Sequence, residues 1–135
     1  MSPLFTKLNL KSQPEILVLN SPDSFEKDLK SLPDNLRITR RIDKIEAFEF
    51  ALVFATRRAE VAKLSKWLAA KAEGDAVLWF AYPKGTSKKY QCDFNRDTGW
   101  DELRKLGFDT VRQVAIDEDW SALRFRRVEF IKTAR

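Results

Sequence analysis

The sequence predicts a doubly wound, three-layer α/β domain whose sheet is mostly parallel, with about six strands, the last of them antiparallel. Apolar runs of strand length alternate with stretches of helical periodicity, which is typical of strand-helix-strand units. Residues 117–120 separate the last two expected strands and are too few for a parallel crossover, so this pair must be antiparallel. The 135 residues, 44% hydrophobic and 33% charged, fit one globular domain over residues 1–135.

The N-terminal quarter of the chain predicts an arm, a strand and a short helix. Residues 1–13 are polar, and we interpret them as an N-terminal arm that packs on something larger. The near-continuous apolar run at residues 15–20 predicts a strand that is buried on both faces. Ser21 and Pro22 predict the N-cap and the first position of an amphipathic helix that ends at Pro33.

Two further strands and a longer helix follow. Residues 36–42 predict a weak edge strand, because charged residues flank Ile38. Residues 48–54 predict a central strand, since the later part of this run is wholly apolar. Thr56 predicts the N-cap of a helix that ends before Gly74. The buried stripe of this helix is expected at Val61, Leu64, Leu68 and Ala72.

The third quarter predicts the innermost strand and the longest loop. Residues 76–82 are the most apolar run of the chain, and Pro83 ends the strand that they predict. Residues 84–97 are polar and predict a loop. Residues 98–101 have the spacing of a capping box, and Gly107 supplies a left-handed C-cap for the short helix between them.

The closing antiparallel pair is expected at residues 110–116 and 121–131. In the second of these strands the apolar residues change face after residue 125. This change predicts a bulge at residues 126–127.

The order of these elements carries a resemblance. The second half of the chain resembles the second half of a methyltransferase-type Rossmann fold. It has a helix, residues 74–79, a polar loop, a further helix and a closing antiparallel pair. The segments LWFAYPK, DFNRD, AID and WSALRF are similar to those of a bacterial family of small proteins of unknown function. The resemblance is strongest over residues 77–127. It implies strand order 2-1-3-4-6-5 with only strand 6 antiparallel, and it implies no established activity.

Several chemistries are missing from the sequence. Histidine is absent, which excludes Ser-His-Asp and Cys-His catalysis and every metal site that uses histidine. Cys92 has no partner for an internal disulfide and is either an inert thiol or a nucleophile. Magnesium on Asp93, Asp97 and Asp117 remains open beside the interpretation of these residues as caps and surface charge, and we expect no metal.

We also expect no cofactor. A methyltransferase needs glycine after its first strand, so that the backbone can approach S-adenosylmethionine closely. Here that turn, at residues 20–23, reads Asn-Ser-Pro-Asp and contains no glycine. The sequence contains neither GxGxxG nor GxxxxGK followed by Ser or Thr.

Charge and hydropathy restrict the partners. The net charge of +5 comes from basic doublets that are scattered among carboxylates, which favours a solvated surface and makes nucleic acid an unexpected partner. The longest apolar runs are far below the ~20 residues that span a bilayer, so we expect no membrane insertion. With a single cysteine and no leader-like start, a cytoplasmic location is expected.

Polar residues gather at one predicted edge of the sheet. In open α/β sheets ligands bind beyond the carboxyl ends of the strands. The expected helix starts at Thr56 and Thr98 point free amides to this edge, which favours an anion. Tyr82, Trp100 and Trp120 could supply stacking walls. The candidate ligand-binding residues are Arg57, Lys84, Ser87, Asn95, Arg96, Asp97, Asp117 and Trp120.

Two functions and one structural alternative remain open. One function is a small binding or regulatory module on a methyltransferase-like scaffold without its cofactor, with an anionic small molecule, a protein or a second copy of the chain as partner. The other is an enzyme that acts on an anionic small molecule. In the structural alternative, Arg96 and Asp97 clamp the loop while the tryptophans belong to the core.

Overall fold

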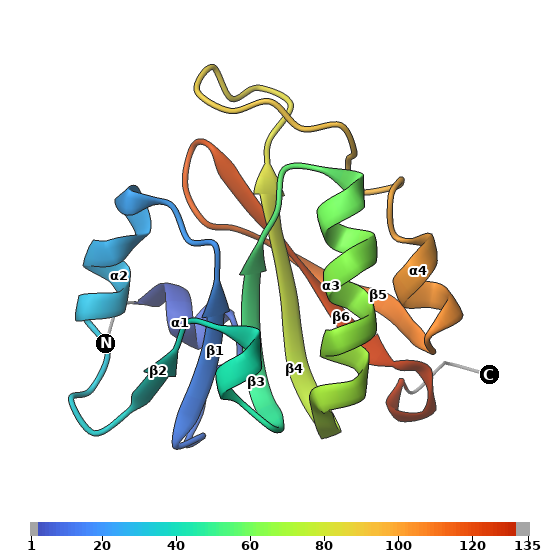
Figure 1. Ribbon diagram of the computed structural model, residues 1–135. Coiled ribbons are helices and arrows are strands. Elements are labelled where there is room, and N and C mark those ends of the chain that lie inside the picture. The colour runs from blue at the N-terminus through green and yellow to red at the C-terminus, as the bar shows by residue number, and fades with distance from the viewer. Residues whose placement is uncertain (1–2, 132–135) are drawn as a thin grey trace.

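The computed structural model describes residues 3–131 and contains a six-stranded mixed sheet (Figure 1). The strand order is β2-β1-β3-β4-β6-β5. Strand β6 is antiparallel to both of its neighbours, and the other neighbouring pairs are parallel. The predicted fold class and strand order are therefore confirmed. The strands are β1 (Glu15–Leu19), β2 (Arg37–Thr39), β3 (Phe48–Phe54), β4 (Ala72–Pro83), β5 (Phe108–Ala115) and β6 (Trp120–Arg127).

Helices cover both faces of the sheet. Figure 1 shows α3 (Arg58–Lys71) and α4 (Asp101–Lys105) in front of it and α1 (Pro3–Lys7) behind it. The helix α2 (Glu26–Lys30) shares the core cluster of α1. Alternate residues of each inner strand point to opposite faces, so Leu17 packs towards α3 while Ile16 packs towards α1. The central parts of β1, β3 and β4 are continuous apolar runs because both of their faces are buried, as predicted.

The N-terminal segment belongs to the core of this fold. Phe5, Leu8 and Leu10 are buried, and the indole Nε1 of Trp79 donates a hydrogen bond to the carbonyl oxygen of Leu8. We expected an arm that packs on something larger. Instead, this segment packs on the chain's own sheet. Phe5 and Leu8 are three residues apart, which places both side chains on one helix face.

The predicted helix starts at Ser21, Thr56 and Thr98 are wrong. After β1 the backbone of Pro22 is extended, and a 3-10 turn, η1 (Asp23–Phe25), leads into α2. Helix α3 begins at Arg58 and α4 at Asp101, without a hydrogen bond from the side chain of either capping residue. A carboxylate from a distant loop replaces the expected local cap at α3, as described below. Gly107 after α4 does adopt φ +93, the left-handed conformation that was predicted.

Strand ends also differ from the predicted ones. Strand β2 is limited to three residues, and a 3-10 turn, η2 (Ile42–Lys44), replaces its expected continuation. Strand β6 ends at Arg127, where η3 (Val128–Phe130) begins. The predicted bulge at residues 126–127 is therefore wrong. The register irregularity of this pair lies in β5 instead, between Thr110 and Arg112.

Candidate functional site

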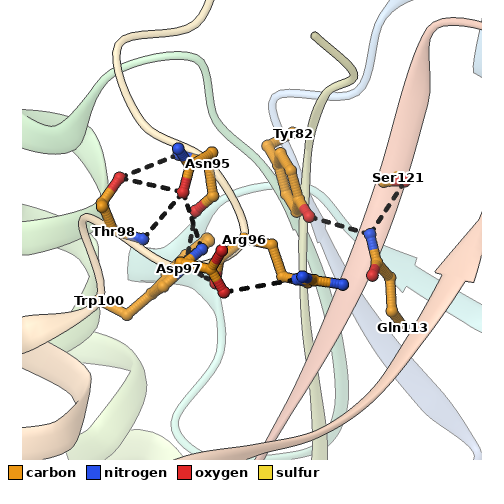
Figure 2. Close-up of polar contacts among 8 residues, drawn as sticks. All are labelled: Tyr82, Asn95, Arg96, Asp97, Thr98, Trp100, Gln113 and Ser121. Atoms are coloured by element: carbon orange, nitrogen blue, oxygen red, sulfur yellow. Dashed lines mark hydrogen bonds and ion pairs between the residues drawn. The ribbon is translucent and has the colours of Figure 1, made fainter.

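The carboxyl ends of β4 and of the edge strand β5 border a hollow of about 470 Å³. We call it the carboxyl-edge hollow. The loop after β4 forms one side of it and the β5–β6 hairpin the other (Figure 2). Its lining residues are Tyr82, Lys84, Gly85, Thr86, Asn95, Arg96, Asp97, Gln113 and Ser121.

Buried hydroxyl groups form the floor of the hollow. Tyr82 and Ser121 are cross-strand partners in β4 and β6, and they are only 5% and 7% exposed. The amide Nε2 of Gln113 donates to the Tyr82 hydroxyl at 3.1 Å and to Ser121 Oγ at 3.5 Å (Figure 2). Both hydroxyls therefore accept a bond from Gln113 and keep their own hydrogens for a ligand.

The protonation of Tyr82 follows from its surroundings. Burial raises the pKa of its hydroxyl, and the positive charge of Arg96 opposes this shift. The hydroxyl therefore remains a neutral donor at physiological pH. It suits the oxygen of an anionic or carbonyl group better than it suits general-base chemistry.

Two cations flank these hydroxyls. The main chain of Lys84 is fixed by a 2.8 Å hydrogen bond from its N–H to the carbonyl oxygen of Asp119. The Lys84 ammonium makes no ion pair with any of residues 3–131. Figure 2 shows Arg96 reaching from the loop towards Tyr82 and Gln113. Its contact with Asp97 is long, at 3.5 Å, and both side chains are more than 60% exposed, so this pair holds Arg96 weakly.

Asn95 and Trp100 fold the loop that carries Arg96. The Asn95 side-chain oxygen accepts from the N–H groups of Asp97 and Thr98, at 2.8 and 3.1 Å. The Trp100 indole donates to the carbonyl oxygens of Asn95 and Arg96, both at 2.9 Å (Figure 2). Trp100 is fully buried, so the expectation that it walls a ligand site is wrong. Its indole instead anchors the loop that carries Arg96 through these two hydrogen bonds.

Three other predicted residues also act as supports outside the hollow's lining. Ser87 donates to Asp119 at 2.9 Å and accepts from two main-chain N–H groups of its own loop. Asp117 accepts from the N–H groups of Asp119 and Trp120 and so closes the β5–β6 turn. Trp120 is 3% exposed and packs between the rings of Phe54 and Tyr90.

The structure also separates Arg57 from Lys84 and Arg96. Arg57 lines a neighbouring hollow together with Gln91, Cys92 and Asp93. Burial raises the pKa of the Cys92 thiol, which leaves little reactive thiolate at neutral pH. Among residues 3–131 no three Cys, Asp or Glu side chains are arranged to hold a metal ion.

Two main-chain amides at and just before the start of α3 already have carboxylate acceptors. Asp93 Oδ1 accepts from the N–H of Arg58 at 2.6 Å, and Glu60 Oε1 accepts from the N–H of Thr56 at 3.0 Å. These carboxylates occupy the place at which we expected an anion, so the argument from free helix amides is wrong for α3. Of the predicted anion site, the part that remains is the pair of cations Lys84 and Arg96, in and beside the loop after β4.

Gln113 and Ser121 were missed in the sequence, and Tyr82 was considered only as an aromatic wall. The three come together through the pairing of β6 with β4 and β5, a register that the sequence does not display. One signal was present: Ser121 is a polar residue within the buried strand β6, which often indicates a group with a hydrogen-bonding role.

The turn after β1 lies beside another hollow on the same edge. Asn20 adopts φ +60, and its side-chain Nδ2 donates to the carbonyl oxygen of Phe54 at 3.4 Å. Pro22 follows in extended conformation and has no N–H to offer. After β2 comes Arg40, whose guanidinium is bonded to both carboxylate oxygens of Glu26.

Comparison with known proteins identifies the fold. No family model matches the sequence, and no curated protein matches it. A SAM-dependent methyltransferase from Aquifex aeolicus aligns at a TM-score of 0.61, with 14% identity over 93% of this chain and 88% of that chain. The N-methyltransferase NodS from Bradyrhizobium japonicum WM9 aligns at 0.56, with 14% identity over 92% of both chains. The magnesium protoporphyrin IX methyltransferase ChlM from Synechocystis PCC 6803 aligns at 0.57, with 12% identity over 92% of this chain and 78% of that chain.

At these identities the likeness shows the fold alone, a methyltransferase-like Rossmann fold. The resemblance to a bacterial family of small proteins of unknown function stays a prediction. No helix within residues 3–131 has both the length and the apolar character needed to cross a membrane.

The cofactor of this fold, S-adenosylmethionine, does not fit the residues present. The side chain of Asn20 bridges the β1 turn to β3, where glycine would let the backbone approach a ligand. Pro22 removes one donor from the same turn. In dinucleotide-binding sheets an acidic residue about 20 positions further on binds the ribose hydroxyls, and the chain carries basic Arg40 there.

Proposed function

We propose that the protein binds a small anionic molecule in the carboxyl-edge hollow and acts as a binding or regulatory module. The observation that carries this proposal is the position of Lys84 and Arg96 beside two buried hydroxyls. A carboxylate or phosphate between them would accept from Lys84, Arg96, Tyr82 and Ser121. Bonds from charged donors are stronger than neutral ones and give orientation to the bound group.

The arrangement favours binding over catalysis. An enzyme that acts on an anionic small molecule would need a base or a nucleophile in reach of its substrate. Tyr82 lies in the hollow, but burial raises the pKa of its hydroxyl and disfavours the phenolate. Asp97 is exposed and its contact with Arg96 is long, so its carboxylate is poorly fixed for a catalytic role.

The test compares ligand-induced stabilisation across variants. Melting temperatures are measured with phosphate, citrate and nucleoside monophosphates for wild type, Arg96→Ala and Lys84→Ala. The matched control is Arg41→Ala, an exposed arginine paired with Asp43. We expect stabilisation in wild type and control, and a binding free energy weaker by about 1 to 3 kcal/mol in each site variant.

The unliganded proteins supply the decisive contrast. Because Arg96 is mostly exposed, Arg96→Ala should unfold close to wild type without ligand. If Arg96→Ala instead unfolds much earlier and no anion shifts the wild type, the loop is scaffolding and the proposal fails.

A second measurement concerns the cofactor. Titration calorimetry with S-adenosylmethionine should detect no binding, because the β1 turn has no glycine and its Asn20 side chain is bonded to β3. A dissociation constant in the low micromolar range would contradict both the missing cofactor and the preference for a non-enzyme.

A further inference from the structure

Three arginines gather on the opposite face of the sheet from the carboxyl-edge hollow's floor. Arg112 of β5 and Arg124 of β6 are direct cross-strand partners. Arg126 lies two residues further along β6, on the same face of the sheet. We call these three residues the arginine face. It borders the area that α1 covers, since Arg112 donates to the side-chain oxygen of Asn9 at 3.2 Å.

The three guanidinium groups are unequally paired. Arg126 binds both carboxylate oxygens of Asp75, at 2.8 and 2.5 Å. Within residues 3–131, the Arg112 guanidinium has only the neutral amide of Asn9 as a partner. The Arg124 guanidinium makes no hydrogen bond or ion pair to any of residues 3–131, and its Nε is buried without an acceptor. One carboxylate therefore serves three positive charges.

This arrangement is unfavourable for the protein alone. Burial lowers the pKa of Arg124, and the positive charges of Arg126 and Arg112 lower it further, while the negative charge of Asp75 opposes this shift. Like charges directly opposite each other on neighbouring strands destabilise a sheet. A buried donor without an acceptor adds a further cost. The cost of the opposed like charges falls when an anion from outside bonds to the guanidinium groups of Arg112 and Arg124 together.

The surroundings distinguish between kinds of anionic partner. The arginines stand on a strand face, and none of the hollows described above includes them. Strand β5 is the sheet edge, so one side of its backbone is open to a further strand. Trp79, the aromatic partner of Arg124 in β4, is fully buried and offers no surface for stacking a nucleic acid base.

We infer that the arginine face docks an extended acidic segment of a partner protein, whose carboxylates bridge Arg112 and Arg124. A segment that pairs along β5 places every second side chain on this face, so alternating acidic residues fit it. The partner thereby supplies the carboxylates that the face lacks. This inference does not depend on the anionic molecule proposed for the carboxyl-edge hollow.

The test uses a fluorescently labelled peptide of alternating glutamate and threonine. Binding is followed by anisotropy for wild type, Arg124→Met and Arg112→Met, with Arg41→Met as the matched control. We expect the control to bind like wild type and both face variants to bind at least about tenfold more weakly. Rising salt should weaken the wild-type complex, because its contacts are ionic.

Stability separates this role from a structural one. Arg124→Met keeps an apolar side chain and removes an unpartnered charge, so its urea midpoint should equal or exceed that of wild type. A peptide of alternating lysine and threonine should not bind. The inference is overturned if Arg124→Met binds the acidic peptide like wild type, if the lysine peptide binds equally well, or if a single-stranded RNA oligomer binds more tightly than the acidic peptide.

Discussion

Trp79 and Leu8 are joined across 71 residues of sequence by a 2.7 Å hydrogen bond from the indole Nε1 to the carbonyl oxygen. Both side chains are fully buried. The bond fixes the end of α1 to the centre of β4, and it gives the buried indole the one acceptor it needs. The N-terminal segment is thus held by a specific contact as well as by apolar packing.

Trp79→Phe should therefore destabilise the protein strongly. The change removes the donor to Leu8 and leaves a smaller ring in a close-packed core, and together these should cost about 2 to 4 kcal/mol. Urea unfolding measures this loss. The control is Trp67→Phe on the exposed side of α3, which should stay within about 0.5 kcal/mol of wild type. Equal losses in the two variants would show that the bond contributes nothing.

Asp93→Ala should weaken the start of α3. The Asp93 carboxylate accepts from the N–H of Arg58 across 35 residues, so its loss leaves a helix amide without a partner. A cost of about 0.5 to 2 kcal/mol is expected, the range for a helix N-cap. Asp93→Asn keeps an oxygen acceptor and should lose less. Asp34→Ala removes an exposed carboxylate elsewhere, and a loss there as large as in Asp93→Ala would refute the capping role.

Acid should remove the contribution of the Asp75–Arg126 pair. The hydrogen bonds from Arg126 hold the pKa of Asp75 below its ordinary 3.8, so the folded protein keeps this carboxylate ionised at lower pH than the unfolded chain does. The resulting stability is present above the unfolded pKa and is lost as pH falls through the folded pKa.

Melting temperatures of wild type and Asp75→Asn, followed from neutral pH to about pH 2.5, test this prediction. The advantage of wild type should be constant above about pH 5 and should shrink in acid. An advantage that stays constant down to the lowest pH would show that the pair is not linked to folding.

Much of the fold could be predicted because burial on both faces leaves a strong pattern. Residues 48–54 of β3 were predicted with the observed ends, and the short 117–120 link required the antiparallel pairing of β5 with β6. The helix starts could not be predicted in the same way. The sequence offered Thr56 as a local cap. In the structure Asp93, from the loop after β4, accepts from the first amide of α3 and takes the place of that cap.

The candidate site shows the same division. Lys84, Arg96 and Asp97 were visible because they follow a strongly apolar strand, and the carboxyl end of such a strand faces an open edge. The role of Gln113 and Ser121 could not be predicted, since they come near Tyr82 only through the register of β4, β5 and β6. The lack of a partner for Arg124 could not be predicted either, because it depends on side-chain geometry and not on the spacing of residues in the sequence.

The insertion of β6 between β4 and β5 has a consequence for synthesis of the chain. In the described part of the chain, residues 3–131, β5 has no neighbour in the sheet other than β6, although β6 comes after it in the sequence. While the chain leaves the ribosome, β5 has no strand to pair with until residues 120–127 emerge, and the open side of β4 stays unpaired for the same time. Stalling within this interval would expose two unpaired strands to neighbouring nascent chains.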